Sequence, residues 1–334
     1  MFQSDNELQR RTDFPHSLPA GHAPADRRQF LGRTAAAAAT GLVAAFGSTS
    51  PSPAEAASPI KRHSGSYMKL SLAAYSFNRY LPKSWTPEEL AAAKMTLRDF
   101  IEYCASLDLD GTELTGYYFP KTVTPAYLME LKQKTFRSGL DISGTAVGNN
   151  FGLVDGEEAQ KQLADMRAWI DYAALMGAPV IRIFAGTVPK GETEQATIER
   201  CIRRISQSLE YAAQKGVFLA LENHGGITST SEQMLKIIRG VNESPWFGVN
   251  FDSGNFRTAE PYADLEKIAP YAINAQIKLS MAREGQKEEA DLERVIGILR
   301  SAGYRGYVVL EYEEKDEPRD VIPKVIARLR QLTA

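Results

Sequence analysis

The chain has few of the residues that build zinc clusters and disulfide frameworks. Its 334 residues include two cysteines, Cys104 and Cys201, and four histidines. The two cysteines lie far apart in helical patterns, and neither has a Cys or His beside it. We therefore predict that both are buried free thiols that take part in neither a disulfide nor a metal site.

An excess of one charge is also absent. The sequence has 39 Lys and Arg against 41 Asp and Glu, for a formal net charge of −2. The first 57 residues hold five basic and five acidic residues, so the rest of the chain keeps the balance of −2. A near-neutral surface offers no basic footprint for nucleic acid, and we predict no nucleic-acid partner.

Long apolar runs are missing outside the N-terminal region. The Ala-rich stretch Thr34–Phe46 is short for a membrane span, which needs about 20 apolar residues. It follows the twin-arginine pattern RRQFLG at Arg27 and precedes the small-x-small sequence Ala54–Ala56. We predict that residues 1–57 are a twin-arginine signal peptide and linker. The twin-arginine translocase would then export the protein to the periplasm or the exterior, with no stable membrane association after cleavage. The alternative is an uncleaved anchor or a disordered tail.

Apolar runs alternate with helical patterns from Met68 onward. The predicted strands are Lys69–Tyr75, Gly111–Leu114, Asp141–Ala146, Val180–Phe184, Phe218–Glu222, Phe247–Phe251, Ala275–Lys278 and Tyr307–Glu311. Helical patterns include Thr96–Leu107, Ala159–Met176, Thr193–Lys215, Ser231–Val241, Glu288–Ala302 and Asp320–Leu332. Lys83–Met95 and Ala185–Glu192 are the longer loops. Ser231 is a plausible N-cap, and Gly216 and Gly303 are placed as C-caps.

Continuous apolar strands predict a parallel sheet covered by helices. About 277 residues remain after cleavage, which suits a single (β/α)₈ barrel of roughly 250 residues. No G-x-G-x-x-G follows the first strand, so the usual argument for a dinucleotide-binding sheet does not apply. We predict one (β/α)₈ barrel domain over residues 68–334.

Four polar residues stand at the ends of successive apolar runs. They are Glu222, Asp252, Gln276 and Glu311, at intervals of 30, 24 and 35 residues. A strand and its returning helix take about that length, so the four side chains would share one end of the barrel. Barrels of this kind have their active sites at the carboxyl ends of the strands. Three converging carboxylates raise each other's pKa, and a divalent cation is the simplest way to keep all three ionised. The amide oxygen of Gln276 would complete an oxygen-rich shell.

Five further polar residues lie near the same strand ends and are candidates for substrate binding: Glu113, Arg182, His224, Asn255 and Lys278. Each has a second interpretation. Arg182 and Lys278 would otherwise neutralise the carboxylates, and Glu113 would pair with Arg182. His224 would otherwise be a core histidine, and Asn255 an Asx-turn residue.

The segments ENHGG at Glu222, DSGN at Asp252 and LE ending at Glu311 resemble the xylose-isomerase-like superfamily of sugar isomerases and epimerases. The similarity runs from about Leu70 to Leu332. It implies a metal held by residues at the ends of strands five to eight, which here are Glu222, Asp252, Gln276 and Glu311. Relatives usually have His where this chain has Gln276, and the weaker amide ligand favours Mn²⁺ or Mg²⁺ over Zn²⁺.

The resemblance also implies a mechanism. A metal chelates a carbonyl oxygen and an adjacent hydroxyl of the sugar and stabilises the enediolate, while Glu222 and Glu311 exchange the proton. The predicted protein is thus a divalent-metal-dependent isomerase or epimerase of a free sugar, an oxidised sugar or a glycoside. Barrels of this type often pair, so a homo-oligomer is possible.

The sequence leaves two other functions open and argues against a third. The same site would suit a lyase or hydratase acting on 3-keto-glycosides. The replacement of His by Gln276 keeps a non-catalytic carbohydrate-binding barrel possible. The endonuclease branch of the superfamily needs a His-rich zinc cluster and a basic groove, which the composition argues against.

Overall fold

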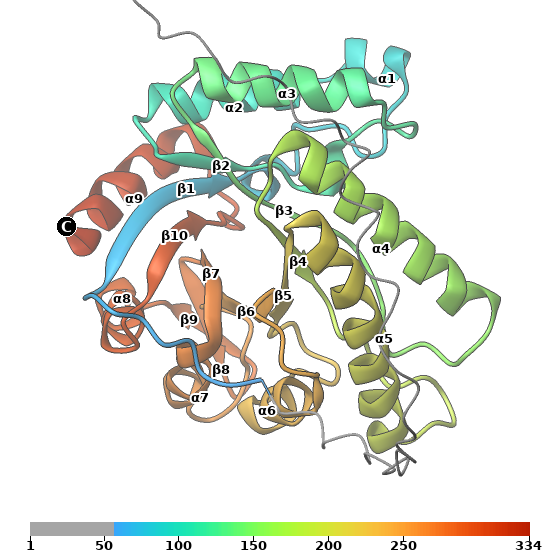
Figure 1. Ribbon diagram of the computed structural model, residues 1–334. Helices are drawn as coiled ribbons and strands as arrows, with labels where there is room; N and C mark the ends of the chain where they lie inside the picture. Colours follow the sequence, from blue (N-terminus) through green and yellow to red (C-terminus); the bar gives the residue numbers. More distant parts are fainter. Residues whose placement is uncertain (1–56) are drawn as a thin grey trace, which may run out of the picture. The chain divides into compact units, whose positions relative to one another are not determined.

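A closed barrel of eight parallel strands forms the centre of the described structure (Figure 1). The computed structural model describes residues 57–334, so the predicted signal peptide and linker lie outside the described residues except for Ala57. The strands are β1 (Tyr67–Ala73), β2 (Gly111–Glu113), β3 (Asp141–Ala146), β4 (Val180–Ile183), β5 (Phe218–Glu222), β6 (Phe247–Asp252), β7 (Ala272–Ile277) and β10 (Arg305–Leu310). They follow one another around the wall, and β1 pairs with β10 to close it. The predicted (β/α)₈ barrel is confirmed.

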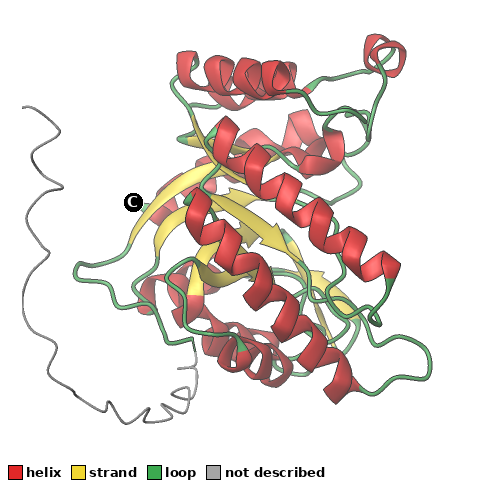
Figure 2. Ribbon diagram, turned by 45° about the vertical axis from the view of Figure 1, so that its right-hand side comes forward, coloured by secondary structure: helices red, strands yellow, loops and turns green. Residues whose placement is uncertain are grey.

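Helices cover the outside of the strands (Figure 2). They are α1 (Pro87–Ala91), α2 (Leu97–Ser106), α3 (Pro125–Arg137), α4 (Glu157–Met176), α5 (Glu194–Lys215), α6 (Ser231–Gly240), α7 (Pro261–Ile268), α8 (Leu292–Ser301) and α9 (Pro318–Thr333), with 3₁₀ turns at Ala74–Phe77, Gly116–Tyr118 and Ala269–Tyr271. Within the described residues, no helix combines the length and apolarity needed to cross a membrane.

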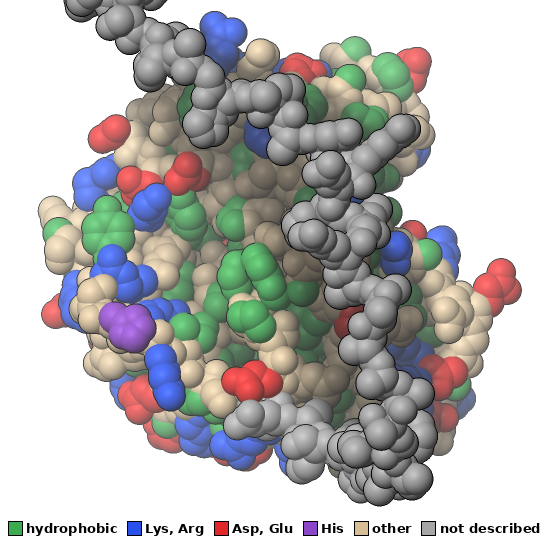
Figure 3. Space-filling view, viewed as in Figure 1, with side chains coloured by type: hydrophobic (Ala, Val, Ile, Leu, Met, Phe, Trp, Pro, Cys, Tyr) green, Lys and Arg blue, Asp and Glu red, His purple; other side chains and the backbone are tan. Residues whose placement is uncertain are grey.

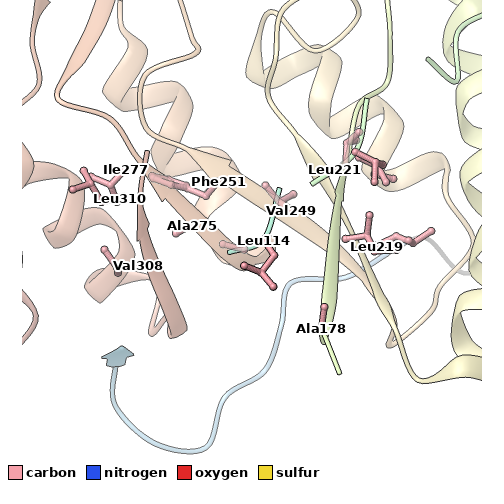
Figure 4. Packing of buried hydrophobic residues seen from close by; sticks show 14 of the residues in the cluster. Leu114, Ala178, Leu219, Leu221, Val249, Phe251, Ala275, Ile277, Val308 and Leu310 are labelled. Atoms are coloured by element: carbon pink, nitrogen blue, oxygen red, sulfur yellow. The ribbon is translucent and has the colours of Figure 1, made fainter. Parts of the chain in front are cut away.

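The strands alternate between an apolar outer face and a polar inner face. Leu219 and Leu221 of β5, like Val249 and Phe251 of β6, belong to the hydrophobic core under the helices (Figure 4). Because successive side chains in a strand point to opposite faces, Glu222 points into the barrel. The sequence pattern predicts continuously apolar strands. The strands are indeed buried on both faces, but the barrel interior is held by polar side chains that hydrogen-bond to one another.

A β-hairpin interrupts the expected strand–helix alternation after β7. Strand β8 (Ser280–Arg283) pairs in antiparallel fashion with β9 (Gln286–Glu289). The helix expected from Glu288 therefore begins at Leu292, where the Asp291 side chain accepts a hydrogen bond from the Arg294 amide at 3.0 Å. The prediction failed here because charged residues at helical spacing also suit a solvent-facing hairpin.

Local capping residues explain two further differences. Thr86 and Glu89 form a capping box that starts α1 within the expected loop Lys83–Met95. Helix α6 is capped by Thr230 rather than Ser231, because the Ser231 hydroxyl hydrogen-bonds to Asp264 of α7.

Two smaller predictions are confirmed. Gly216 ends α5 with a φ of +70°, a left-handed conformation that glycine adopts without strain. Cys104 and Cys201 are buried free thiols.

Charged side chains of both signs are interspersed on the visible part of the face in Figure 3, with hydrophobic side chains towards its middle. Neither sign covers a broad continuous area there. This distribution is what the near-neutral composition leads us to expect.

Candidate active site at the barrel mouth

The carboxyl ends of four strands bring the predicted site residues together. Glu222 ends β5 and Asp252 ends β6, Gln276 lies one residue before the end of β7, and Glu311 follows β10 directly. All four side chains are buried, with relative exposures of 6% or less. They fall into two connected groups, one around the Lys278 ammonium and one around the Glu222 carboxylate.

The Lys278 ammonium lies among four oxygen atoms. It is 3.2 Å from Asp252 Oδ2, 3.3 Å from Glu311 Oε2 and 3.2 Å from Glu313 Oε2. It also donates to Asn255 Oδ1 at 3.2 Å. Burial disfavours the charged form of Lys278, but the nearby carboxylates outweigh burial and raise its pKa well above the ordinary value. Burial raises the pKa of Asp252 to about 6, with Lys278 opposing the rise.

The Glu222 carboxylate is held by two amide donors and one ion pair. Asn250 Nδ2 donates to Oε2 at 3.0 Å, and Asn255 Nδ2 donates to Oε1 at 2.9 Å. Arg182 Nε lies 2.9 Å from Oε2, but its N–H is not aligned for a hydrogen bond, so this contact is an ion pair. Burial raises the pKa of Glu222, and Arg182 acts in the opposite direction. The donors favour the ionised form, but burial outweighs them, and the pKa of Glu222 lies well above its ordinary value.

Arg182 is fixed by the walls of the barrel mouth. It donates to the Val147 carbonyl at 2.8 Å and to the Tyr117 hydroxyl at 3.3 Å, and its guanidinium lies 3.8 Å from the centre of the Phe184 ring. Among the described ion pairs Arg182 joins Glu222, and the alternative pairing with Glu113 is not found.

Glu113 instead contacts Gln276 across the barrel. Gln276 Nε2 donates to the two Glu113 oxygens at 3.0 and 3.3 Å, and Gln276 Oε1 accepts from Asn250 Nδ2 at 2.6 Å. Strands β2 and β7 are not neighbours, so this contact spans the interior. Burial, helped by the charge of Glu311, raises the pKa of Glu113 to about 7.

His224 lies exposed at the rim, so it is not a core histidine. Its ring stacks on Phe184 with centroids 4.1 Å apart, and its backbone amide donates to Thr228 Oγ1 at 3.0 Å. Partial burial against this ring, together with Arg182, lowers the pKa of His224 to about 4. The imidazole is therefore neutral at pH 7, with one nitrogen that donates and one that accepts.

A pocket of about 350 Å³ opens beside the cluster and is lined by His224, Gly225, Ser229, Asn255 and Arg257. A larger pocket of about 820 Å³ lies between the β8–β9 hairpin and α9. None of the predicted site residues lines that larger pocket. We place the candidate site at the smaller one, because Asn255 links it to both Glu222 and Lys278.

A family model described as the xylose isomerase-like TIM barrel matches residues 101–332. The chain belongs to this family. No curated protein matches the chain.

Several solved structures share the fold at low sequence identity. A xylose isomerase domain protein from Planctomyces limnophilus is 19% identical with a TM-score of 0.60, covering 80% of this chain and 97% of that one. A xylose isomerase-like TIM barrel protein from Mycobacterium smegmatis in complex with magnesium is 18% identical with a TM-score of 0.62, covering 80% and 96%. The 3-keto-D-glucoside 4-epimerase from E. coli is 16% identical with a TM-score of 0.61, covering 79% and 98%.

Three residues of the site were missed from the sequence. Asn250 and Asn274 lie two positions before Asp252 and Gln276, and Asn274 Nδ2 donates to Asn250 Oδ1 at 2.8 Å. Glu313 lies two positions after Glu311 and contacts Lys278. The two-residue period of extended backbone would have placed all three on the inner face. The prediction of continuously apolar strands left no place for this alternation.

The four predicted metal ligands do not fit a cation shell in this xylose isomerase-like barrel. A bound Mg²⁺ ion needs free oxygen atoms about 2.0–2.1 Å away. Gln276 Oε1 is taken by Asn250, both Glu222 oxygens are taken by donors, and Lys278 lies between Asp252 and Glu311. Among the described residues, no group of three or more His, Cys, Asp or Glu is placed to hold a metal ion.

Proposed function

We propose that the protein is a sugar isomerase or epimerase that moves a proton on the carbon next to a carbonyl, through an enediolate. One observation carries the proposal: Glu222 and Glu311 reach the barrel mouth from strands separated by β6 and β7, with Arg182 and Lys278 beside them. Membership of the xylose isomerase-like family supports it, as does the similarity in fold to a keto-sugar epimerase.

The two carboxylates take the proton-transfer roles. Glu222 Oε1 contacts Asn255, which lines the pocket, so this oxygen adjoins the space where a sugar would bind. Glu311 contacts Lys278 on the other side of the mouth. One group removes the proton from one face of the substrate, and the other returns it. The side chains expected to hold Mn²⁺ or Mg²⁺ are already engaged with Asn250, Asn255 and Lys278.

The remaining residues bind and orient the substrate. Neutral His224 and the amide of Asn255 line the pocket and can bind sugar hydroxyls. Arg182 holds Glu222 in place, and Glu113 holds the side-chain amide of Gln276 by accepting its hydrogen bond. A free sugar, an oxidised sugar or a 3-keto-glycoside is the substrate class that fits an exported enzyme. A homo-oligomer stays a prediction.

Proton exchange with solvent tests the reaction whichever sugar product is formed. The purified protein is incubated in D₂O with a panel of ketoses and 3-keto-glycosides, and NMR follows deuterium at the carbon next to the carbonyl. We expect exchange by the wild type and a loss of about 10²–10⁴-fold in Glu222→Gln and Glu311→Gln. Glu210→Gln, an exposed carboxylate on α5, is the matched control and should retain full exchange.

The same experiment separates the rival functions. Release of an aglycone or of water from a 3-keto-glycoside would identify a lyase or hydratase. Sugar binding without any exchange would identify a carbohydrate-binding barrel. Either result would overturn the isomerase or epimerase proposal.

A further inference from the structure

We propose that Lys278 is the resident cation of this site. Its ammonium group lies beside Asp252 and Glu311, two of the four residues that the family resemblance assigns to a metal ion, and it binds the substrate carbonyl oxygen. The first part concerns which cation the carboxylates hold and is independent of the reaction. The second part rests on the proposed function.

The fold builds a fixed path for the Lys278 side chain. The Lys278 backbone amide donates to Ser253 Oγ at 2.8 Å, and the Ser253 amide donates to the Gln276 carbonyl at 3.0 Å. These bonds tie the ends of β6 and β7 together. A Cβ atom on Gly254 would lie 3.0 Å from both Cβ and Cδ of Lys278 and 2.5 Å from the Ser280 carbonyl. The aliphatic part of the Lys278 side chain therefore passes directly over Gly254. Any residue other than glycine at position 254 would crowd it and collide with the Ser280 carbonyl.

The oxygen atoms around the ammonium share two residues with the donor set expected for a divalent ion, Asp252 and Glu311. Three carboxylate oxygens, from Asp252, Glu311 and Glu313, and one amide oxygen, from Asn255, lie 3.2–3.3 Å from Nζ. The expected metal shell also had three carboxylates and one amide. An ion bound between Asp252 and Glu311 would require Lys278 to leave, because two cations at this distance repel each other.

The ammonium has more acceptors than it has protons to donate. A lysine donates at most three hydrogen bonds, and four oxygens surround it. Asp252 Oδ2 lies 3.2 Å away without an aligned hydrogen bond. Glu313 is 39% exposed, and Asn255 lines the pocket. A substrate oxygen entering from the pocket can therefore replace one of these two rim partners while Asp252 and Glu311 stay bound.

Binding of the substrate oxygen to Lys278 stabilises the enediolate more than the ground state. The carbonyl oxygen of the bound sugar is neutral, whereas the enediolate oxygen carries a negative charge. A fixed ammonium in a largely water-excluded site interacts more strongly with the charged oxygen, which lowers the barrier to proton removal.

Metal analysis and Mn²⁺ calorimetry of the full-length protein test the identity of the cation. We expect the wild type to hold well below one divalent ion per chain after dialysis and to give no saturable Mn²⁺ binding. Lys278→Met leaves three carboxylates without their cation, so we expect it to bind Mn²⁺ at least tenfold more tightly than the wild type. Lys287→Met is the matched control, since Lys287 contacts only Glu314 among the described ion pairs and is exposed. It should behave as the wild type does.

Each outcome decides the inference. About one tightly held divalent ion per wild-type chain, or equal Mn²⁺ affinity in wild type and Lys278→Met, would overturn it. The wild-type measurement stands even where Lys278→Met does not fold, and Lys278→Arg, which keeps the charge, should remain free of Mn²⁺.

Activity separates this inference from the proposed function. Deuterium exchange that persists in excess chelator supports both, and exchange abolished by chelator and restored by Mn²⁺ would overturn the role of Lys278 alone. Absence of exchange on every sugar of the panel, with no metal bound, would remove the proposed function and the carbonyl contact. It would leave Lys278 as the cation that the carboxylates hold.

Discussion

At the residue scale, the site contains more buried carboxyl groups than buried cationic groups. Four buried carboxyl groups and two cations form the cluster, with Glu313 at its exposed rim: Glu113, Glu222, Asp252 and Glu311, with Arg182 and Lys278. Burial raises the pKa of Glu113 to about 7 and that of Asp252 to about 6. Protonation therefore removes part of the excess negative charge near neutral pH.

The Glu113 carboxyl makes the stability depend on pH in a defined direction. Its pKa is 4.5 ordinarily and about 7 in the folded protein, so the folded state binds more protons between these values. The stabilisation is complete below pH 4.5 and is lost as the pH rises through 7, a change of about 3 kcal/mol. We expect Glu113→Gln to abolish this part of the slope in urea unfolding measured from pH 4.5 to 8.5.

Glu210→Gln is the control for that series, because Glu210 is an exposed carboxylate on α5. Its curve should run parallel to the wild-type curve. A wild-type stability that rises between pH 5 and 7 relative to Glu113→Gln would show that Glu113 is ionised in the folded state.

At the element scale, contacts between the loops that follow the strands hold the site in place. The β4–α5 and β5–α6 loops touch where the Ile227 amide donates to the Gly186 carbonyl at 3.1 Å. Gly226 has a φ of +55°, and a Cβ atom there would lie 2.2 Å from that carbonyl oxygen. Only glycine allows the two loops to approach so closely, and this contact holds the loop that carries His224.

The cap of α6 gives a prediction at this scale. Thr230 Oγ1 accepts a hydrogen bond from the Gln233 amide at 3.2 Å, and the Gln233 side chain accepts one from the Thr230 amide at 3.1 Å. We expect Thr230→Ala to lower the free energy of unfolding by about 1 kcal/mol in urea denaturation. Thr230→Ser keeps the capping oxygen and should stay within about 0.5 kcal/mol of the wild type. Equal losses in both variants would assign the effect to the methyl group.

At the scale of the whole molecule, the barrel interior is a column of polar contacts. Ser71 of β1 and Ser143 of β3 share a buried hydrogen bond of 2.7 Å. The ion pair of Lys69 and Asp141, 3.1 Å long, lies nearer the amino ends of the strands and is exposed to solvent. The asparagines beneath Glu222 and Gln276 continue this column towards the mouth. A polar interior needs every group to have a partner, so it restricts which side chains each position accepts.

Export is the prediction that concerns the whole chain. We propose that the pattern beginning at Arg27 directs the folded protein through the twin-arginine translocase. Replacing Arg27 and Arg28 by lysine should leave the precursor in the cytoplasm, as measured by cell fractionation and immunoblotting. The nearby pair Arg10 and Arg11, also changed to lysine, is the control and should be exported normally. Normal export of the Arg27 and Arg28 variant would remove the twin-arginine assignment.

The order of apolar runs and the spacing of polar residues at their ends were sufficient to predict the barrel and to choose Glu222, Asp252, Gln276 and Glu311. Both depend on local periodicity and on the fixed length of a strand and its returning helix, which a sequence displays directly. The hairpin β8–β9 and the cap at Thr230 were not predicted. The local sequence also suits a helix in the first case and a cap at Ser231 in the second, and tertiary contacts determine which forms.

Which atoms meet inside the mouth was decided by the closed barrel alone. The contact of Gln276 with Glu113 joins residues 163 positions apart, and Lys278 meets oxygens at the carboxyl ends of two other strands. Sequence spacing indicates which end of a strand a residue occupies. The stagger of the strands and the direction of each side chain determine its partner. For that reason Lys278 could be named from the sequence, but the oxygen atoms that surround its ammonium could not.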